Sequence, residues 1–237
     1  MADGPFYQRI ADDFRDQILD GTLPGETKLP SEKELEQRYG VSRIVVKHAL
    51  DVLKAEGLVI GRQGKGVYVR KIDRLVRESP TEYSRTPPPR PPTEREYASN
   101  RDEARPAVAE RLGIAPGDPV MRTQYRYLAA GEPIQIATSW EPLAITGGTA
   151  VERPEESAVT GVTARMEAIG VRVDRVGEAL TCRPATNREK ELLSLGSTGA
   201  YVVLIERTHY AQDQPVETCD LVYPGHRYEF RYAFTVT

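Results

Sequence analysis

Apolar residues near the N-terminus recur with the spacing of an amphipathic helix. Tyr7, Ile10, Ala11, Phe14 and Ile18 follow one another at i, i+3, i+4, i+7 and i+11, so they form one stripe on a helix. Gly21 ends this helix. The segment Ser31-Glu32-Lys33-Glu34 has the sequence of a capping box and therefore predicts a second helix that begins there.

A third helix is predicted from Arg43 to about Glu56, after a tight turn at residues 40–42. Two short β-rich runs follow it, at residues 58–60 and 67–69, and the glycine-rich basic segment 61–66 joins them. Helix, turn, helix and hairpin in this order indicate a winged helix-turn-helix, which places one helix in the major groove of DNA. The apolar positions of the third helix that face the core are Val46, Ala49, Leu50 and Leu53.

The pattern changes at a proline-rich segment. Residues 73–96 are therefore predicted to form a linker. Proline resists both helix and sheet, so a semi-rigid spacer between two domains is expected. A ligand motif of the PxxP type at residues 88–92 is the less favoured alternative. The prolines are Pro80, Pro87, Pro88, Pro89, Pro91 and Pro92.

The remaining chain, residues 97–237, predicts an α+β domain with a largely antiparallel sheet. Thr186-Asn187-Arg188-Glu189 is a second capping box, which begins a helix that reaches residues 195–196. Two further helices are predicted, at 106–112 and 155–168. The predicted strands lie near residues 119–129, 132–140, 171–182, 200–210, 215–223 and 227–236.

An internal repeat supports this layout. Leu112-Gly113 precedes a valine-containing strand, a polar turn and Glu132-Pro133, and Leu195-Gly196 precedes the same series up to Gln214-Pro215. Two such units that share one sheet would leave a cleft between them, which is a natural site for a small ligand.

Composition and charge narrow the class of protein. The net charge of the 237 residues is −3, but its distribution is uneven: residues 1–42 carry five basic and nine acidic side chains, whereas residues 43–71 carry seven basic and two acidic ones. Positive charge therefore gathers on the third helix and the hairpin, where a phosphate backbone would lie. No apolar run is long enough to span a bilayer, and the N-terminus is polar, so we expect a cytoplasmic protein without membrane contact.

The sequence offers little for catalysis or for cofactors. The motifs of serine hydrolases, phosphate-binding loops and zinc proteases are absent. Cys182 and Cys219 are too few for a disulfide scaffold and have no neighbouring residues at metal-ligand spacing. We therefore expect no enzyme, no metal and no cofactor.

Residues 7–69 resemble the DNA-binding domain of the GntR family of bacterial transcription factors. The segments that carry the resemblance are GTLPGETKLPSE, GVSR, EGL and QGKGVYV. The resemblance implies a DNA-binding domain at 1–72 and DNA contacts from the start of the third helix and from the hairpin tip. The implied contact residues are Lys33, Ser42, Arg43, Ile44, Val45, Lys47, Arg62, Gln63, Gly64 and Lys65.

This chain departs from the family pattern in the reading helix. Where the family has an SRTTVR-like segment, the chain has SRIVVK, so two hydroxyl positions have become Ile44 and Val45. Either side chain is suited to contact with a thymine methyl group. Lys47 replaces an arginine and loses the bidentate fork that reads guanine. We therefore expect an operator that deviates from the usual half-site of the family.

Residues 97–236 resemble the UTRA effector-binding domain of the HutC branch of the same family, through ERLGIAPGDPV, GEPIQIATSWEP and ERTHYAQDQPVE…VYPGHRYEF. The resemblance implies a fold similar to that of chorismate lyase in a protein that binds its ligand without turning it over. Family members that sense sugar phosphates grip the phosphate with an Arg-x-Arg pair, for which this chain has Tyr125 and Tyr127, so a less charged or aromatic ligand is expected. The implied effector contacts are Tyr125, Tyr127, Ser139, Arg175, Glu178, Arg207, Glu217 and Tyr228.

These observations predict a ligand-responsive transcriptional regulator, most simply a repressor. Its expected partners are double-stranded operator DNA with two-fold symmetry, a small metabolite that is anionic or aromatic, and a second copy of the chain. One alternative is a DNA-binding protein whose C-terminal domain only dimerises and binds no ligand. The other alternative is a lyase-like enzyme, which the absence of catalytic motifs disfavours.

Overall fold

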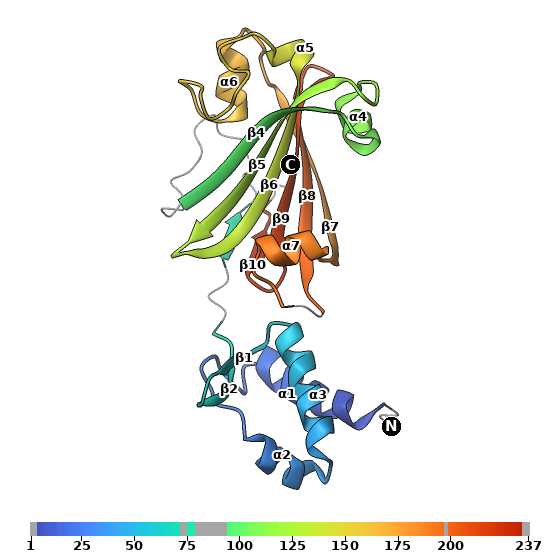
Figure 1. Ribbon diagram of the computed structural model, residues 1–237, viewed down its shortest axis with the longest axis vertical. Coiled ribbons are helices and arrows are strands. Elements are labelled where there is room, and N and C mark those ends of the chain that lie inside the picture. The colour runs from blue at the N-terminus through green and yellow to red at the C-terminus, as the bar shows by residue number, and fades with distance from the viewer. Residues whose placement is uncertain (1–3, 72–74, 79–93, 197–198, 234–237) are drawn as a thin grey trace.

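The computed structural model describes residues 4–71, 75–78, 94–196 and 199–233. A group of three helices with a hairpin forms the N-terminal part, and a six-stranded sheet with short helices forms the C-terminal part (Figure 1). No helix among the described residues combines the length and the apolar character that a membrane crossing requires.

The N-terminal part has the predicted order of helices and hairpin. The stripe Ile10, Ala11 and Phe14 is buried against the inner face of the third helix. The first capping box is present: the backbone N–H of Ser31 donates to the Glu34 carboxylate at 2.7 Å, and that of Glu34 donates to the Ser31 hydroxyl at 3.3 Å. The elements are α1 (Phe6–Leu19), α2 (Glu32–Tyr39), α3 (Arg43–Ala55), β1 (Val59–Arg62) and β2 (Gly66–Val69).

The C-terminal part is built on one antiparallel sheet with the strand order β4-β5-β6-β9-β8-β7. Two short helices, α4 (Pro106–Leu112) and α7 (Asn187–Leu192), cover one face of it (Figure 1). A two-stranded parallel ribbon of β3 (Leu75–Glu78) and β10 (Tyr228–Arg231) packs on the other face. The sheet strands are β4 (Glu94–Glu103), β5 (Pro119–Ala129), β6 (Glu132–Pro142), β7 (Arg175–Pro184), β8 (Tyr201–Ala211) and β9 (Gln214–Pro224).

The internal repeat is a feature of the fold. Strands β5 and β6 correspond to β8 and β9 at a constant offset of 82 residues, since 119–129 becomes 201–211 and 132–142 becomes 214–224. The register shift after Tyr127 recurs after His209, at the same offset. The two units meet where β6 pairs with β9, and the equivalent residues Thr138 and Asp220 are partners there. A pseudo-two-fold axis therefore passes through this pair.

The structure corrects three element boundaries. The helix predicted at 155–168 is only α6 (Val162–Ala168), because Gly161 has φ 85° and residues 154–160 form turns; a one-turn helix, α5 (Leu143–Thr146), precedes them. The strand predicted from residue 171 begins at Arg175, because the Val171 N–H instead caps α6 by donating to the Met166 carbonyl. The second capped helix ends at Leu192, before the positive φ of Ser194.

Both ends of the segment predicted as a linker form strands. Residues 75–78 are β3, and β4 begins at Glu94. The prolines of that segment, from Pro80 to Pro92, lie outside the described residues, as do residues 234–236 of the last predicted strand.

Candidate functional site

Two regions of the molecule bring together the residues that the sequence singled out. One is the exposed surface of α3 and the β1–β2 hairpin. The other is a pocket on the face of the sheet that carries β10.

The start of α3 presents charged and apolar side chains to the solvent. Ser42 is its N-cap residue, and Arg43, Ile44 and Lys47 are exposed, Ile44 by 80% of its surface. Val45 is half-buried and packs against the core of the N-terminal part, and its contact with DNA stays a prediction. Of the two apolar replacements, Ile44 therefore lies on the outer surface and Val45 supports the helix.

The hairpin tip and the start of α2 are exposed as well. Arg62, Gln63, Gly64 and Lys65 are all exposed, and Gly64 has a φ of 70°, which glycine adopts without strain. Lys33 is exposed in the first turn of α2.

Two of the predicted DNA-contact arginines have carboxylate partners. Arg43 pairs with Glu32 at 2.6 Å and Arg62 pairs with Glu26, in both cases at the surface. Exposed pairs of this kind contribute little to stability, so a phosphate can replace the carboxylate at small cost.

The pocket on the sheet has a volume of about 200 Å³ and lies across the pseudo-two-fold axis. Its floor is symmetric in position: six residues of the first repeat line it, and so do the six residues 82 positions later. The equivalent pairs are Tyr125 and Arg207, Tyr127 and His209, Gln135 and Glu217, Ala137 and Cys219, Ser139 and Leu221, and Glu141 and Tyr223.

The segment from Pro154 to Arg165 closes the pocket from above, through Glu155, Thr160, Gly161 and Val162. An ion pair between Arg165 of α6 and Glu141 of β6 anchors this segment to the sheet, and both side chains are almost fully buried. Arg165 also donates to the Val151 carbonyl at 2.9 Å. Burial raises the pKa of Glu141 to about 7, and the charge of Arg165 opposes that shift.

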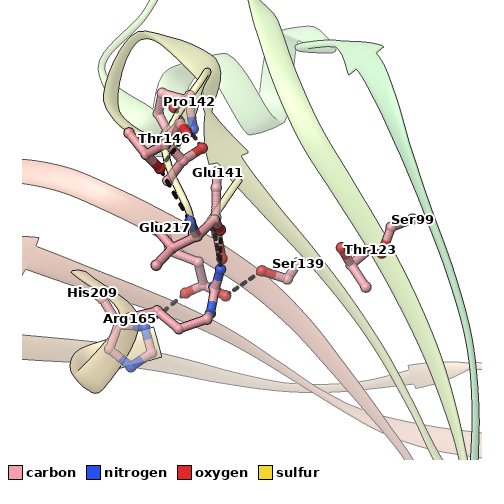
Figure 2. A network of polar contacts seen from close by, with 11 residues as sticks. Ser99, Thr123, Ser139, Glu141, Pro142, Thr146, Arg165, His209 and Glu217 are labelled. Atoms are coloured by element: carbon pink, nitrogen blue, oxygen red, sulfur yellow. Dashed lines mark hydrogen bonds and ion pairs between the residues drawn. The ribbon is translucent and has the colours of Figure 1, made fainter. Parts of the chain in front are cut away.

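Glu217 is the centre of a second buried group (Figure 2). Its carboxylate accepts from the Ser139 hydroxyl at 2.6 Å and lies 2.7 Å from Nδ1 of His209. Burial opposes the negative charge of Glu217, but His209 and Ser139 outweigh it and hold the pKa of Glu217 below its ordinary value. Burial, and then the Glu155 carboxylate with its hydrogen bond to the phenol, raise the pKa of Tyr125, so its phenol is protonated.

Five of the eight predicted effector residues line this pocket: Tyr125, Tyr127, Ser139, Arg207 and Glu217. The other three lie outside its lining. The guanidinium of Arg175 stacks on the Tyr210 ring at 3.6 Å, and the Tyr228 ring packs against Tyr223 at 4.7 Å. Glu178 lies behind Arg207 and pairs with it at 2.7 Å.

Sequence reasoning missed Glu141, Arg165 and His209. The offset of 82 residues was a usable signal for His209, because it is the repeat equivalent of Tyr127. No signal marked Arg165, since the predicted helix around it was misplaced at its start.

Comparison with known proteins decides the family. Residues 6–69 match the model of the bacterial regulatory proteins of the gntR family, and residues 92–229 match the UTRA domain. The chain belongs to the GntR family of bacterial regulators. As a member with a UTRA domain, it is a ligand-responsive DNA-binding transcriptional regulator and not an enzyme.

The similarity to known proteins extends over nearly the whole chain. It is 28% identical to the transcriptional repressor NagR of Bacillus subtilis, over 95% of this chain and 93% of that one. It is 26% identical to the histidine utilization repressor of Pseudomonas putida, over 98% and 95%. A crystal structure assigned to a GntR-family transcriptional regulator has 42% identity and a TM-score of 0.71, covering 98% of both chains. PhnF from Mycobacterium smegmatis, at 21% identity and a TM-score of 0.56 over 96% of this chain and all of that one, shares the fold.

Proposed function

We propose that this regulator represses transcription as a homodimer in the cytoplasm, and that a small metabolite in the sheet pocket releases it from a palindromic operator. The observation that carries the DNA-binding part is the exposure of Arg43, Ile44 and Lys47 at the start of α3, together with the exposed hairpin tip. Arg43, Lys47, Arg62 and Lys65 of the basic stretch 43–71 are exposed in these two places, and phosphate contacts depend on such charge.

Within this surface we assign different tasks to different residues. Arg43, Ile44 and Lys47, in the first two turns of α3, read base edges in the major groove. Lys33, Ser42 and the hairpin residues contact the phosphate backbone, which sets the position of the protein and carries no sequence information by itself. Two copies of the chain related by a two-fold axis would require an operator with the same symmetry.

A shared carboxylate supports coupling between the pocket and the DNA-binding part. Glu178 accepts from Arg207, which lines the pocket, and from Arg77 of β3, in both cases at 2.7 to 2.8 Å. Strand β3 follows the hairpin by a few residues, so a ligand that moves Arg207 also disturbs the contact that holds β3 on the sheet. The ligand changes the operator affinity by the factor by which its own affinities for the two arrangements differ, one with β3 held on the sheet and one with this contact disturbed.

The DNA-binding part also contacts the C-terminal part just after α3. Gly57, directly after α3, faces the ring of His226, and a Cβ atom there would lie 3.0 Å from the ring. A displacement of the β9–β10 connection would therefore be transmitted to the end of α3, the helix proposed to read the DNA.

The proposal is tested with mobility-shift assays on DNA upstream of the regulator's own gene. We expect a retarded complex whose stoichiometry is two chains per operator, and its loss in Lys47→Ala. Glu110→Gln, an exposed change on α4 at a distance from the basic surface, is the matched control and should bind as the wild type does. If folded protein gives no specific complex even at low salt, the proposal fails.

A thermal-shift screen of metabolites tests the effector part. Stabilisation that disappears in Glu217→Gln supports a ligand in the pocket. If no compound in a broad screen stabilises the protein, while operator binding is intact, the C-terminal part is a dimerisation domain only.

A further inference from the structure

The charged side chains around the sheet pocket balance one another. Among the described residues, three arginines and three glutamates line it, and the arginines come from three different parts of the fold. The arginines are Arg95 on β4, Arg165 on α6 and Arg207 on β8; the glutamates are Glu141, Glu155 and Glu217.

Each of these arginines is held by a carboxylate of the protein itself. Arg165 pairs with Glu141, and Arg95 pairs with Glu155. Arg207 contacts one oxygen of Glu178 through Nε at 2.8 Å and through Nη2 at 2.7 Å. The cationic groups that would bind a phosphate or a carboxylate are therefore already engaged.

The glutamates are engaged in the same way. Glu217 lies between His209 and Ser139, at 2.7 and 2.6 Å, with only 1% of its surface exposed. Glu141 is equally buried against Arg165. A charged ligand at Arg165, Glu141 or Glu217 would have to break a buried pair and leave one partner behind, which is strongly destabilising. The pairs of Arg207 and Arg95 are less buried, but each guanidinium already has a carboxylate partner.

We propose that the effector of this regulator is a small uncharged molecule, a ring that carries hydroxyl or amide groups. This inference rests on the proposed effector role of the pocket and names the class of ligand. Of the two expected kinds of metabolite, anionic or aromatic, it favours the less charged one, because the arginines that the pocket contains are neutralised from within.

The shape of the pocket supports a ring. The first repeat contributes Tyr125 and Tyr127, whose rings stack at 5.9 Å with an angle of 23° between their planes. The second repeat places Arg207 and His209 at the equivalent positions, and Glu217 is the strand partner of His209. The two outer strands of the floor thus differ, since β5 contributes tyrosines and β8 contributes Arg207 and His209, which suits a ligand with an apolar face and donor groups along one edge.

Inorganic phosphate is the probe that tests the charge argument without knowledge of the natural effector. We expect that millimolar phosphate, against sodium chloride of equal ionic strength, produces no saturable rise in the melting temperature of the wild type. Glu178→Gln removes one negative charge between Arg77 and Arg207, and Glu155→Gln removes the partner of Arg95. Both variants should bind phosphate with an affinity about tenfold or more above that of the wild type, as expected for a new hydrogen bond to a charged group.

Glu96→Gln is the matched control, because Glu96 pairs with Arg126 on the helix-covered face of the sheet. It should leave phosphate without effect. A parallel calorimetric comparison of glucose with glucose 6-phosphate, and of benzamide with benzoate, should favour the uncharged member of any pair that binds.

Saturable phosphate binding by the wild type would overturn the inference, and so would a charged member that binds more tightly than its uncharged counterpart. The inference also fails if neither Glu178→Gln nor Glu155→Gln binds phosphate while circular dichroism shows that both variants are folded. None of these measurements involves DNA, so a failure of the regulator to bind its operator is recorded separately in the mobility shift.

Discussion

Protonation of His226 should weaken the fold as the pH falls from neutral to 5. This imidazole is half-buried in the β9–β10 connection, where it packs against Gly57 and lies near Arg70 and Arg227. Burial, and then the two neighbouring guanidiniums, lower the pKa of His226 from 6.5 to about 4.

The sign of the effect follows from proton uptake. The unfolded chain protonates His226 at its ordinary pKa, whereas the folded chain does so only near pH 4, so between these values the unfolded state binds more protons. The contribution of His226 to stability is complete above pH 6.5 and declines as the pH falls toward 4. At pH 5 the two pKa values give a loss of about 2 kcal/mol relative to pH 8.

The assay uses the single tryptophan of the chain, Trp140, which packs in the C-terminal part. Urea unfolding followed by its fluorescence at pH 8 and pH 5 gives the stability loss of that part. His226→Gln should lose about 2 kcal/mol less than the wild type over this interval. The difference between the two proteins removes the contributions of all other titrating groups.

His48→Gln is the control for this experiment. His48 is exposed and stacks on Tyr7 in the N-terminal part, with ring centroids 3.9 Å apart, whereas Trp140 reports the C-terminal part. This variant should retain the full loss of the wild type. Equal losses in His226→Gln and the wild type would refute the assignment of the low pKa to His226.

Three further changes test the capping box, the buried ion pair and the hairpin tip. Ser31→Ala removes the cap of α2 and should destabilise the N-terminal part by about 1 kcal/mol, measured by circular dichroism during urea unfolding; an unchanged midpoint would contradict it. Glu141→Gln leaves Arg165 buried without its anionic partner and should cost about 3–5 kcal/mol in the Trp140 transition. Lys65→Ala should reduce the slope of log affinity against log salt by about 0.9 if it contacts one phosphate, and a slope equal to that of the wild type would exclude that contact.

The N-terminal part was predictable because its signals are local. A capping box, a left-handed glycine and an apolar stripe each depend on residues within a few positions of one another, and all three recur in the structure around Ser31, Gly40 and Phe14. The half-burial of Val45 depends instead on how α3 packs in the core of the N-terminal part. The pattern of apolar and polar residues along the helix does not predict this packing.

The pocket was only partly predictable, because its side chains meet across strands that are distant in sequence. Tyr125, Ser139 and Glu217 were expected from the family resemblance, whereas nothing in the sequence around Arg165, on the helical part of the predicted segment, indicated its partner on β6. The ion pair between Arg165 and Glu141 spans 24 residues and leaves no periodic trace in the sequence.

The repeat is the one long-range relation that the sequence does contain, and its consequence for the pocket follows from geometry. In an antiparallel sheet whose halves are related by a two-fold axis, equivalent residues point to the same face. Once Tyr127 faces the pocket, its equivalent His209 must also face it, and Gln135 imposes the same condition on Glu217. The identities at these positions are free to diverge while the positions are fixed. The tyrosines of β5 therefore share one floor with Arg207 and His209 of β8, and the ligand has to match both.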